Sequence, residues 1–363
     1  MKKYQLYVET FGCQMNDYDS EQMVRLMEDQ NYVQTQDVNQ ADLILLNTCS
    51  IREKAEQKVY SYLGRLRKLK EKKPDLLIGV SGCVAQQEGE KLLQDIPYLD
   101  LVIGTHGFYR LPQLVDEVNK TGHPVCWTAF DYHTLSAPKP KKAPTSVKAN
   151  LAIMQGCDNY CAYCVVPYVR GREISRPVSD ILDEARGLLK EGIKEITLLG
   201  QNVNSYGRGL EPPISFTGLI KKIAGLPGLL RLRFTTSHPK DISQEVIQAF
   251  SEVEPLCEHM HLPVQSGSTK ILEAMRRKYT REDYLTKVEA LRSVCPDMAL
   301  TTDIIVGFPG ETQADFEQTM DLLDRVRFDG IYSFKYSDRP ITRAAKLANK
   351  IPEEIKRARL TEL

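Results

Sequence analysis

Apolar and polar positions along the first third of the chain form continuous buried runs, each followed by a segment of helical spacing. The runs are "YQLYVET", "ADLILLN", "LLIGVSG" and "LDLVIGT", and the segments after them carry apolar residues three and four positions apart. Continuous apolar strands that alternate with helices are typical of a parallel sheet covered on both faces. The pattern therefore predicts a Rossmann-like parallel α/β domain over residues 1–135.

The second half repeats the same alternation. We expect strands near residues 151–156, 195–199, 231–235, 259–263, 300–306 and 330–336, with helical patterns between them. Six such units predict a partial (β/α)6 barrel over residues 149–340, because full closure requires eight. Residues 136–148, "SAPKPKKAPTSVK", are typical of an extended linker. Residues 341–363 form a helical extension.

Composition narrows the class of protein. Of the 363 residues 42% are apolar and 26% charged, with a net charge of zero, which is typical of a globular protein. No apolar run reaches 18 residues and no signal peptide is evident, so we expect a cytoplasmic protein without a membrane contact. The nine cysteines are an odd number, which favours metal binding or reactive thiols over a disulfide framework.

Three of these cysteines stand close together in "QGCDNYCAYCVVPYVRGR", at Cys157, Cys161 and Cys164. A structural zinc ion requires a fourth ligand that the sequence does not pair with them. A redox dithiol leaves Cys157 without a role, and chance spacing has odds of about one in a hundred. We favour a [4Fe–4S] cluster held by three thiolates, in which the fourth iron is free to bind a small molecule.

A second trio is spread over the N-terminal domain. Cys13, Cys49 and Cys83 each follow a predicted strand, and they lie 36 and then 34 residues apart. Because the carboxyl ends of parallel strands meet at one edge of a sheet, the three thiols are expected to share a site there. Separate buried thiols are the alternative, and that is what we expect of Cys126, Cys257 and Cys295.

The C-x3-C-x-aromatic-C run, with Tyr163 as its aromatic residue, resembles the radical S-adenosylmethionine enzymes. The resemblance implies that the open iron binds the amino and carboxylate groups of S-adenosylmethionine. One electron then cleaves the sulfonium to a 5′-deoxyadenosyl radical. The resemblance also implies cofactor contacts. These are Tyr163 and Ile305 near the adenine, Gly200, Gln201 and Asn202 at the methionine end, and Ser237 and Gln265 on the ribose side.

The N-terminal motifs "FGCQMN", "NTCSIREKA" and "SGCVAQ" resemble the methylthiotransferase branch of that superfamily, which carries a second [4Fe–4S] cluster there. The stretch "CSIREKAEQKV" resembles the members that act on N6-isopentenyladenosine in tRNA. Members acting on threonylcarbamoyl-adenosine or on a ribosomal-protein aspartate are the alternative. The resemblance implies that adenosine 37 gains a methylthio group at C2, that two S-adenosylmethionine molecules are used, and that the two clusters face each other across a closed cavity.

Local charge suggests where tRNA would bind. Residues 51–73 hold nine basic and three acidic residues, which is most simply a solvated helix face. Beside a cluster that must meet tRNA, we expect Arg65, Arg67 and Lys68 to contact phosphates. A second basic group, Arg170, Arg172 and Arg176, is expected to contact substrate or cofactor.

Further partners are expected as well: an electron donor protein and a protein that delivers sulfur or clusters. Relatives continue into a small RNA-binding TRAM-type domain, so we expect this chain to bind tRNA more weakly than they do. The alternative from another class is a zinc- or thiol-dependent RNA-binding protein without radical chemistry.

Overall fold

The structure, a computed structural model, describes residues 3–50, 53–132 and 146–363, without the side chains of residues 53–56. Most of the predicted linker at 136–148, and part of the motif "CSIREKAEQKV" at 49–59, lie outside this description. The chain divides into two compact units, which we describe separately. One contains residues 1–143 and 168–172, and the other contains residues 144–167 and 173–363.

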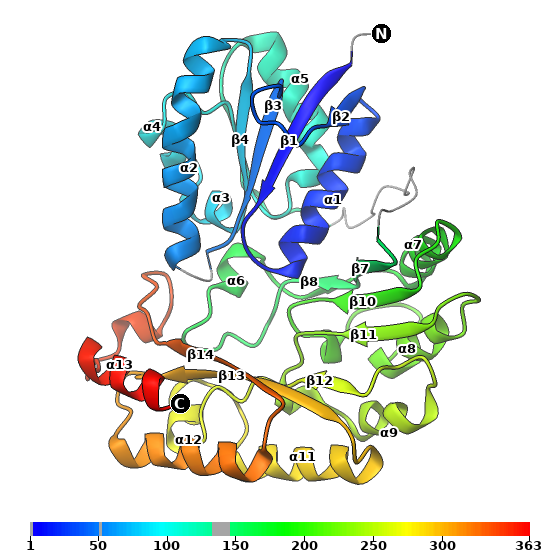
Figure 1. Ribbon diagram of the computed structural model, residues 1–363, viewed down its shortest axis with the longest axis vertical. Helices are drawn as coiled ribbons and strands as arrows, with labels where there is room; N and C mark the ends of the chain where they lie inside the picture. The colour runs from blue at the N-terminus through cyan, green and yellow to red at the C-terminus, as the bar shows by residue number, and fades with distance from the viewer. Residues whose placement is uncertain (1–2, 51–52, 133–145) are drawn as a thin grey trace. The chain divides into compact units, whose positions relative to one another are not determined.

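The N-terminal unit is built on a six-stranded, fully parallel sheet with the order β2-β1-β3-β4-β5-β6 (Figure 1). Its strands are β1 (Tyr4–Thr10), β2 (Tyr32–Gln34), β3 (Leu43–Thr48), β4 (Leu77–Gly82), β5 (Leu101–Ile103) and β6 (Val125–Trp127). Its helices are α1 (Gln14–Glu28), α2 (Glu53–Lys72), α3 (Cys83–Glu88), α4 (Lys91–Asp95), η1 (Phe108–Arg110) and α5 (Leu111–Thr121). The strand order reverses between β1 and β3, the place where doubly wound sheets bind ligands.

Both faces of this sheet are buried, which explains the continuous apolar runs. Leu43 and Leu45 of β3 pack with α1 and α5 on one face, while Ile44 and Leu46 pack with α2, α3 and α4 on the other. Successive side chains of a strand point to opposite faces, so a strand covered on both sides needs apolar residues at every position. Figure 1 shows α1 and α2 on opposite sides of the sheet.

The second unit arranges its main strands as two parallel three-stranded groups, β11-β10-β7 and β12-β13-β14. A bridge between Leu232 and Leu256 connects the first group to the segment before β12. The strands are β7 (Lys148–Ala152), β8 (Met154–Gln155), β9 (Ile174–Ser175), β10 (Glu195–Leu199), β11 (Arg231–Phe234), β12 (His259–His261), β13 (Ala299–Val306) and β14 (Gly330–Lys335).

Helices cover the outer side of these strands around one large apolar core. They are α6 (Val166–Val169), α7 (Val178–Lys190), η2 (Val203–Ser205), α8 (Phe216–Ala224), η3 (Pro239–Asp241), α9 (Gln244–Glu252), α10 (Thr269–Ala274), α11 (Arg281–Val294), α12 (Gln313–Val326), η4 (Ala344–Lys346) and α13 (Glu353–Glu362). Among the described helices, none is both long and apolar enough to cross a membrane.

The predicted fold class is confirmed, since both units are parallel α/β structures with six βα strands in the second. β10 has the predicted bounds, and the other five main strands of the second unit differ from prediction at their ends. Three short strands were not predicted: β2 and β6 at the edges of the N-terminal sheet, and β9, whose antiparallel partner β8 lies within the predicted strand at 151–156.

Candidate functional site

The second unit carries the compact cysteine trio on the loop that follows β8. The left-handed backbone of Tyr160, with φ 50°, turns the loop, and the Cys164 N–H donates to the carbonyl of Cys161 at 3.0 Å. Ala162 fixes the loop to the rest of the unit, because its N–H donates to Met275 and its carbonyl accepts from Ala344, at 2.9 and 2.8 Å. The local turn therefore gathers three thiols that lie within eight residues.

Burial makes Cys157 and Cys164 poor acids in the absence of a metal. Together with the neighbouring Cys161, it raises the pKa of Cys157 to about 11 and that of Cys164 to about 12. A metal binds thiolates and displaces their protons, so these two thiols stay protonated at neutral pH until metal arrives.

Two buried side chains that were not predicted flank Cys161. The Arg277 guanidinium donates to Cys161 Sγ at 3.6 Å and to the Tyr163 hydroxyl at 3.4 Å. His238 Nε2 lies 3.9 Å from the same sulfur, and burial together with Arg277 holds the pKa of His238 well below its usual range. Arg277 and His238 belong to the motifs "RRKYTRE" and "TTSHP", where only the tertiary structure shows which side chain faces the cysteines.

The predicted cofactor contacts lie at strand ends around this loop. Tyr163 and Ile305 pack against one small hydrophobic cluster: Ala162, Ile271, Met275, Phe308, Tyr336 and Ala344. The side-chain oxygen of Gln201 accepts from the Gly156 N–H at 2.6 Å, directly before Cys157. The structure therefore brings Tyr163, Ile305 and Gln201 to the cysteine loop.

Of the other predicted contacts, Gly200 is closely packed, while Asn202 and Ser237 each have a buried polar atom without a hydrogen-bond partner among the described residues. A methyl group on Gly200 would come within 2.5 Å of Met154 Cγ, so only glycine fits there. Asn202 donates to Asp241 at 2.7 Å, while its Oδ1 and the hydroxyl of Ser237 are buried without partners in the described part of the chain. Such atoms suit a polar ligand at these strand ends.

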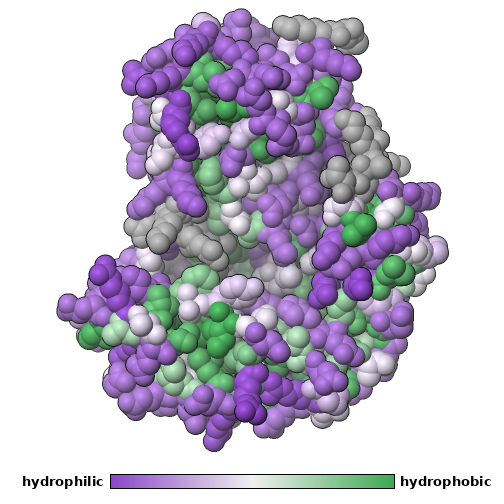
Figure 2. Space-filling model, viewed as in Figure 1, coloured by the Kyte–Doolittle hydropathy of each residue, from purple (hydrophilic) through white to green (hydrophobic). Residues whose placement is uncertain are grey.

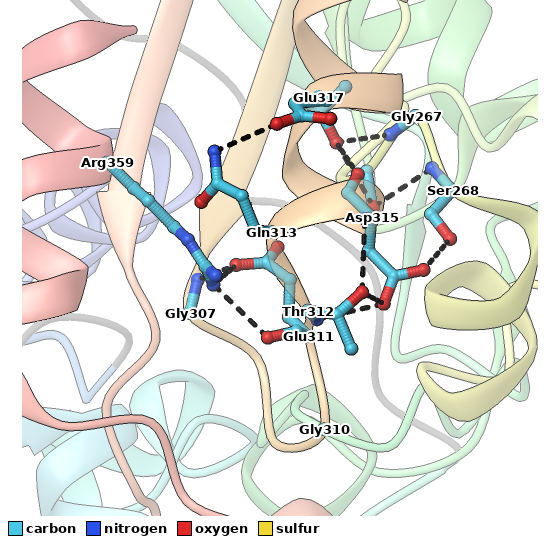
Figure 3. A network of polar contacts seen from close by, with 12 residues as sticks. Gly267, Ser268, Gly307, Gly310, Glu311, Thr312, Gln313, Asp315, Glu317 and Arg359 are labelled. Atoms are coloured by element: carbon cyan, nitrogen blue, oxygen red, sulfur yellow. Dashed lines mark hydrogen bonds and ion pairs between the residues drawn. The ribbon is translucent and has the colours of Figure 1, made fainter.

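Gln265 and Ile305 are fixed relative to each other by the backbone. Gln265 has a left-handed backbone, with φ 76°. Its N–H donates to Asp303 and its carbonyl accepts from Ile305, both at 2.9 Å. The chain after Gln265 is tied to the start of α12, where the Ser268 hydroxyl donates to Asp315 at 2.8 Å (Figure 3). The Lys270 ammonium donates to the same carboxylate at 2.7 Å.

Helix α13 completes this polar network. Glu311 accepts from the Gly307 N–H and from the Arg359 guanidinium of α13, both at 2.6 Å (Figure 3). Glu311 and Arg359 are buried, and Gly307 has φ 72°, a conformation that favours glycine. The pair holds the turn that directly follows Ile305.

The N-terminal trio lies at the carboxyl ends of three adjacent strands, β1, β3 and β4. Cys13 occupies the N-cap position of α1, and Cys83 is the first residue of α3. A methyl group on Gly12 would come within 3.2 Å of Cys49 Sγ, so the turn before Cys13 contacts Cys49. Neighbouring strands are about 4.8 Å apart, which places three successive strand ends within the span of one small cluster.

Asn16 ties these turns together. Its amide donates to the carbonyls of Phe11 and Thr48 at 3.1 and 2.9 Å. Its oxygen lies 3.7 Å from Cys13 Sγ. Burial raises the pKa of Cys83. This thiol therefore loses its proton readily only when a metal or a positive charge stabilises the thiolate.

Three thiols are the donor set of an iron–sulfur cluster that keeps one iron open. In the described part of the chain, no three His, Cys, Asp or Glu side chains are arranged to hold one metal ion. A cubane makes a different demand, because each thiolate binds its own iron at a separate corner. Three cysteine sulfurs in each unit fit that donor set, whereas a tetrahedral zinc site needs ligands that converge.

Two of the three arginines after the compact trio are paired inside the protein. Arg170 and Arg176 are buried and form ion pairs at 2.8 Å with Asp19 and Glu184, and their contact with substrate or cofactor stays a prediction. Arg172 is exposed. The expectation for the remaining thiols is met only by Cys295, since Cys126 and Cys257 are half-buried.

Comparison with known proteins agrees with this architecture. Residues 5–104 match the model of "Uncharacterized protein family UPF0004", and residues 151–323 match that of the radical SAM superfamily. Among solved structures, the chain is similar to the radical S-adenosylmethionine methyltransferase TsrM from Kitasatospora setae. The TM-score is 0.69, the identity 14%, and the match covers 95% of this chain and 77% of that one.

The cobalamin-dependent S-adenosylmethionine radical enzyme OxsB gives a TM-score of 0.62 at 14% identity, over 99% of this chain and 56% of that one. At such identities these two structures demonstrate the fold alone. Fold, site and family models together define a radical SAM protein with an N-terminal UPF0004 domain.

Relatives of higher identity narrow the class. The tRNA-2-methylthio-N(6)-dimethylallyladenosine synthase of Syntrophotalea carbinolica is 52% identical, over 96% of this chain and 80% of that protein. The protein of the same name from Geobacter sulfurreducens is 53% identical, over 99% of this chain and 80% of that protein. The chain belongs to the family of tRNA-2-methylthio-N(6)-dimethylallyladenosine synthases, which confirms the resemblance seen in its sequence.

Proposed function

We propose that this chain replaces the hydrogen on C2 of N6-isopentenyladenosine 37 in tRNA with a methylthio group, using S-adenosylmethionine as methyl donor and radical source. The observation that carries the proposal is the presence of two separate three-cysteine sites in a member of this family. The C2–H bond of adenine is neither acidic nor polarised, so a side-chain base could not activate it.

The cofactors supply the chemistry that side chains lack: when bound, the two [4Fe–4S] clusters and S-adenosylmethionine provide an electron, a sulfur, a methyl group and a carbon-centred radical. Cys157, Cys161 and Cys164 would hold one cluster, and Cys13, Cys49 and Cys83 the other. The chain's own task is to bind, orient and shield these groups.

Several side chains suit that task at the compact trio. Tyr163 and Ile305 offer an apolar surface for an adenine ring. The partnerless oxygens of Asn202 and Ser237 suit the polar parts of the nucleoside and the amino acid. Arg277 contributes positive charge beside Cys161, which offsets the negative charge that a cluster with three thiolates carries.

We place the tRNA contact on α2, whose Arg65, Arg67 and Lys68 are exposed. An electron donor protein must reduce the radical cluster, and a sulfur or cluster delivery protein must renew the consumed sulfur. A cytoplasmic location follows from the substrate.

The test is an anaerobic incubation of the reconstituted chain with S-adenosylmethionine, dithionite and tRNA that carries isopentenyladenosine, followed by nucleoside mass spectrometry. We expect 2-methylthio-N6-isopentenyladenosine. Unmodified tRNA and threonylcarbamoyl-adenosine tRNA should give no methylthio product. A product from the latter tRNA alone would assign the chain to the sister activity, and no product together with bound zinc would favour a binding protein.

A further inference from the structure

A buried guanidinium lies beside the N-terminal cysteine trio, and the proposed function leaves it without a role. Arg170 belongs to the segment 168–172, which is part of the N-terminal unit although it follows the compact trio in sequence. Its side chain is 3% exposed, and its Nη2 donates to Asn16 Oδ1 and Asp19 Oδ2, both at 2.8 Å. Asn16 is the residue whose amide joins the turns before Cys13 and Cys49.

The backbone of this segment is fixed as firmly as the side chain. The Thr105 hydroxyl donates to the carbonyl of Val169 at 2.6 Å, and the His106 ring contacts the carbonyl of Arg170 at 3.0 Å. Both residues follow β5 and are buried. The position of the guanidinium is therefore set from two sides, which is what an electrostatic role at a nearby group requires.

One edge of the guanidinium remains available. Nη1 of Arg170 and Oδ1 of Asp19 are buried and have no hydrogen-bond partner among the described residues. The guanidinium and a thiol of the trio share one acceptor, because Asn16 Oδ1 accepts from Arg170 Nη2 at 2.8 Å and lies 3.7 Å from Cys13 Sγ. A positive, donor-bearing edge is thus held beside this trio.

We propose that Arg170 is a positioning residue of the N-terminal trio, held by Asn16 and Asp19 so that its free edge donates to sulfur at this trio. Its charge then stabilises the additional negative charge that an iron–sulfur group at this trio takes up on reduction. Donors and positive charge next to cluster sulfurs raise the reduction potential. The inference rests on the proposed cluster at this trio, and not on the identity of the tRNA substrate.

The experiment isolates this one group. The full chain with Cys157→Ala, Cys161→Ala and Cys164→Ala is reconstituted without air, and its midpoint potential is measured by titration with dithionite and mediators, followed by electron paramagnetic resonance. Arg170→Gln is expected to make reduction at least tenfold less favourable, a negative shift of 59 mV or more for one electron. Lys120→Gln, at an exposed lysine of α5 in the same unit, should leave the potential unchanged.

Two further variants keep the test decisive. Arg170→Gln alone leaves Asp19 buried and unpaired, which can prevent folding; Asp19→Asn with Arg170→Gln removes both charges and should still make reduction less favourable. Arg170→Lys retains the charge and should shift the potential less than Arg170→Gln. Equal potentials in parent, Arg170→Gln and the double variant would overturn the inference. Failure of the parent to bind about four irons would instead overturn the proposed cluster.

Discussion

At the scale of single residues, several residues around the compact trio have an unusual backbone conformation. Tyr160, Thr236 and Gln265 all have positive φ, at 50°, 66° and 76°. A left-handed backbone costs a non-glycine residue about 1–3 kcal/mol, and such residues concentrate at active sites. Tyr160 lies in the cysteine loop, Thr236 directly precedes Ser237, and Gln265 is itself a residue that we expect to contact the cofactor.

The two trios should be separable by single substitutions. Cys157→Ala is expected to abolish cleavage of S-adenosylmethionine, because it removes a ligand of the radical cluster. Cys49→Ala is expected to preserve cleavage and to stop thiolation, because it disrupts the other cluster. Chromatography of 5′-deoxyadenosine and mass spectrometry of the nucleosides measure the two steps. Cys295→Ala, at a buried thiol outside both trios, should retain both; methylthio product from Cys49→Ala would refute the sulfur-donor assignment.

Individual side-chain partners were the least predictable feature from the sequence. The spacing of the cysteines predicted two thiol sites, since a local turn and a strand period carry that information. The sequence did not predict that Arg170 pairs with Asp19, which is 151 residues away. Pairing across such a separation depends on the folded chain, and a basic residue after a motif has the same appearance in either role.

At the scale of elements, α13 stabilises the end of β13 through one buried ion pair, Arg359–Glu311. The Gly307 turn packs directly on this helix, since a methyl group there would come within 2.4 Å of Lys356 Cγ. The wall provided by Ile305 is therefore supported by α13, which follows it by about 50 residues in the sequence.

Breaking this pair should affect both stability and cofactor binding. Arg359→Met leaves Glu311 buried and unpaired, which typically costs about 3–5 kcal/mol. We expect a loss of that size in the free energy of unfolding and at least tenfold weaker binding of S-adenosylmethionine, measured by denaturation and calorimetry. Arg357→Met on the same helix is the control, since that side chain is 74% exposed. Unchanged cofactor affinity in Arg359→Met would contradict the supporting role of α13.

Helix α2 presents its basic residues to solvent. Arg67 pairs with Glu71 at 3.1 Å and Arg65 lies over the ring of Tyr62 at 4.7 Å. Figure 2 shows that hydrophilic residues cover most of the face of α2 that is visible in this view. Lys70, in contrast, is partly buried and pairs with Asp100 at 2.9 Å.

Charge reversal on α2 should weaken tRNA binding and reduce its dependence on salt. If Arg65, Arg67 and Lys68 each contact a phosphate, the triple change to Glu lowers the slope of log affinity against log salt by about 2–3. Lys120→Glu on α5, which covers the opposite face of the sheet, should have little effect. Filter binding over a salt series measures both, and an unchanged slope in the triple variant would exclude the patch.

The elements most difficult to predict were the shortest ones. β2 and β6 have three residues each and lie at the two edges of the sheet. A strand of that length shows too little periodicity to identify, and its existence depends on a neighbouring strand. The long central strands β3 and β4 are buried at every position, so hydrophobicity alone identified them.

At the scale of the whole molecule, two α/β units each present three cysteines at the carboxyl ends of their parallel strands. In one unit the trio spans three strands and in the other it lies on one loop, yet both arrangements offer three thiols. Parallel sheets place loops after their strands at one edge, which makes these ends the usual position for chemistry.

The most direct test of this account is the iron content of the chain after anaerobic reconstitution. We expect about eight irons per chain, about four when the cysteines of either trio are replaced by alanine, and almost none when all six are replaced. About four irons in the unaltered chain, or zinc in place of iron, would contradict the central claim that each trio holds its own cluster.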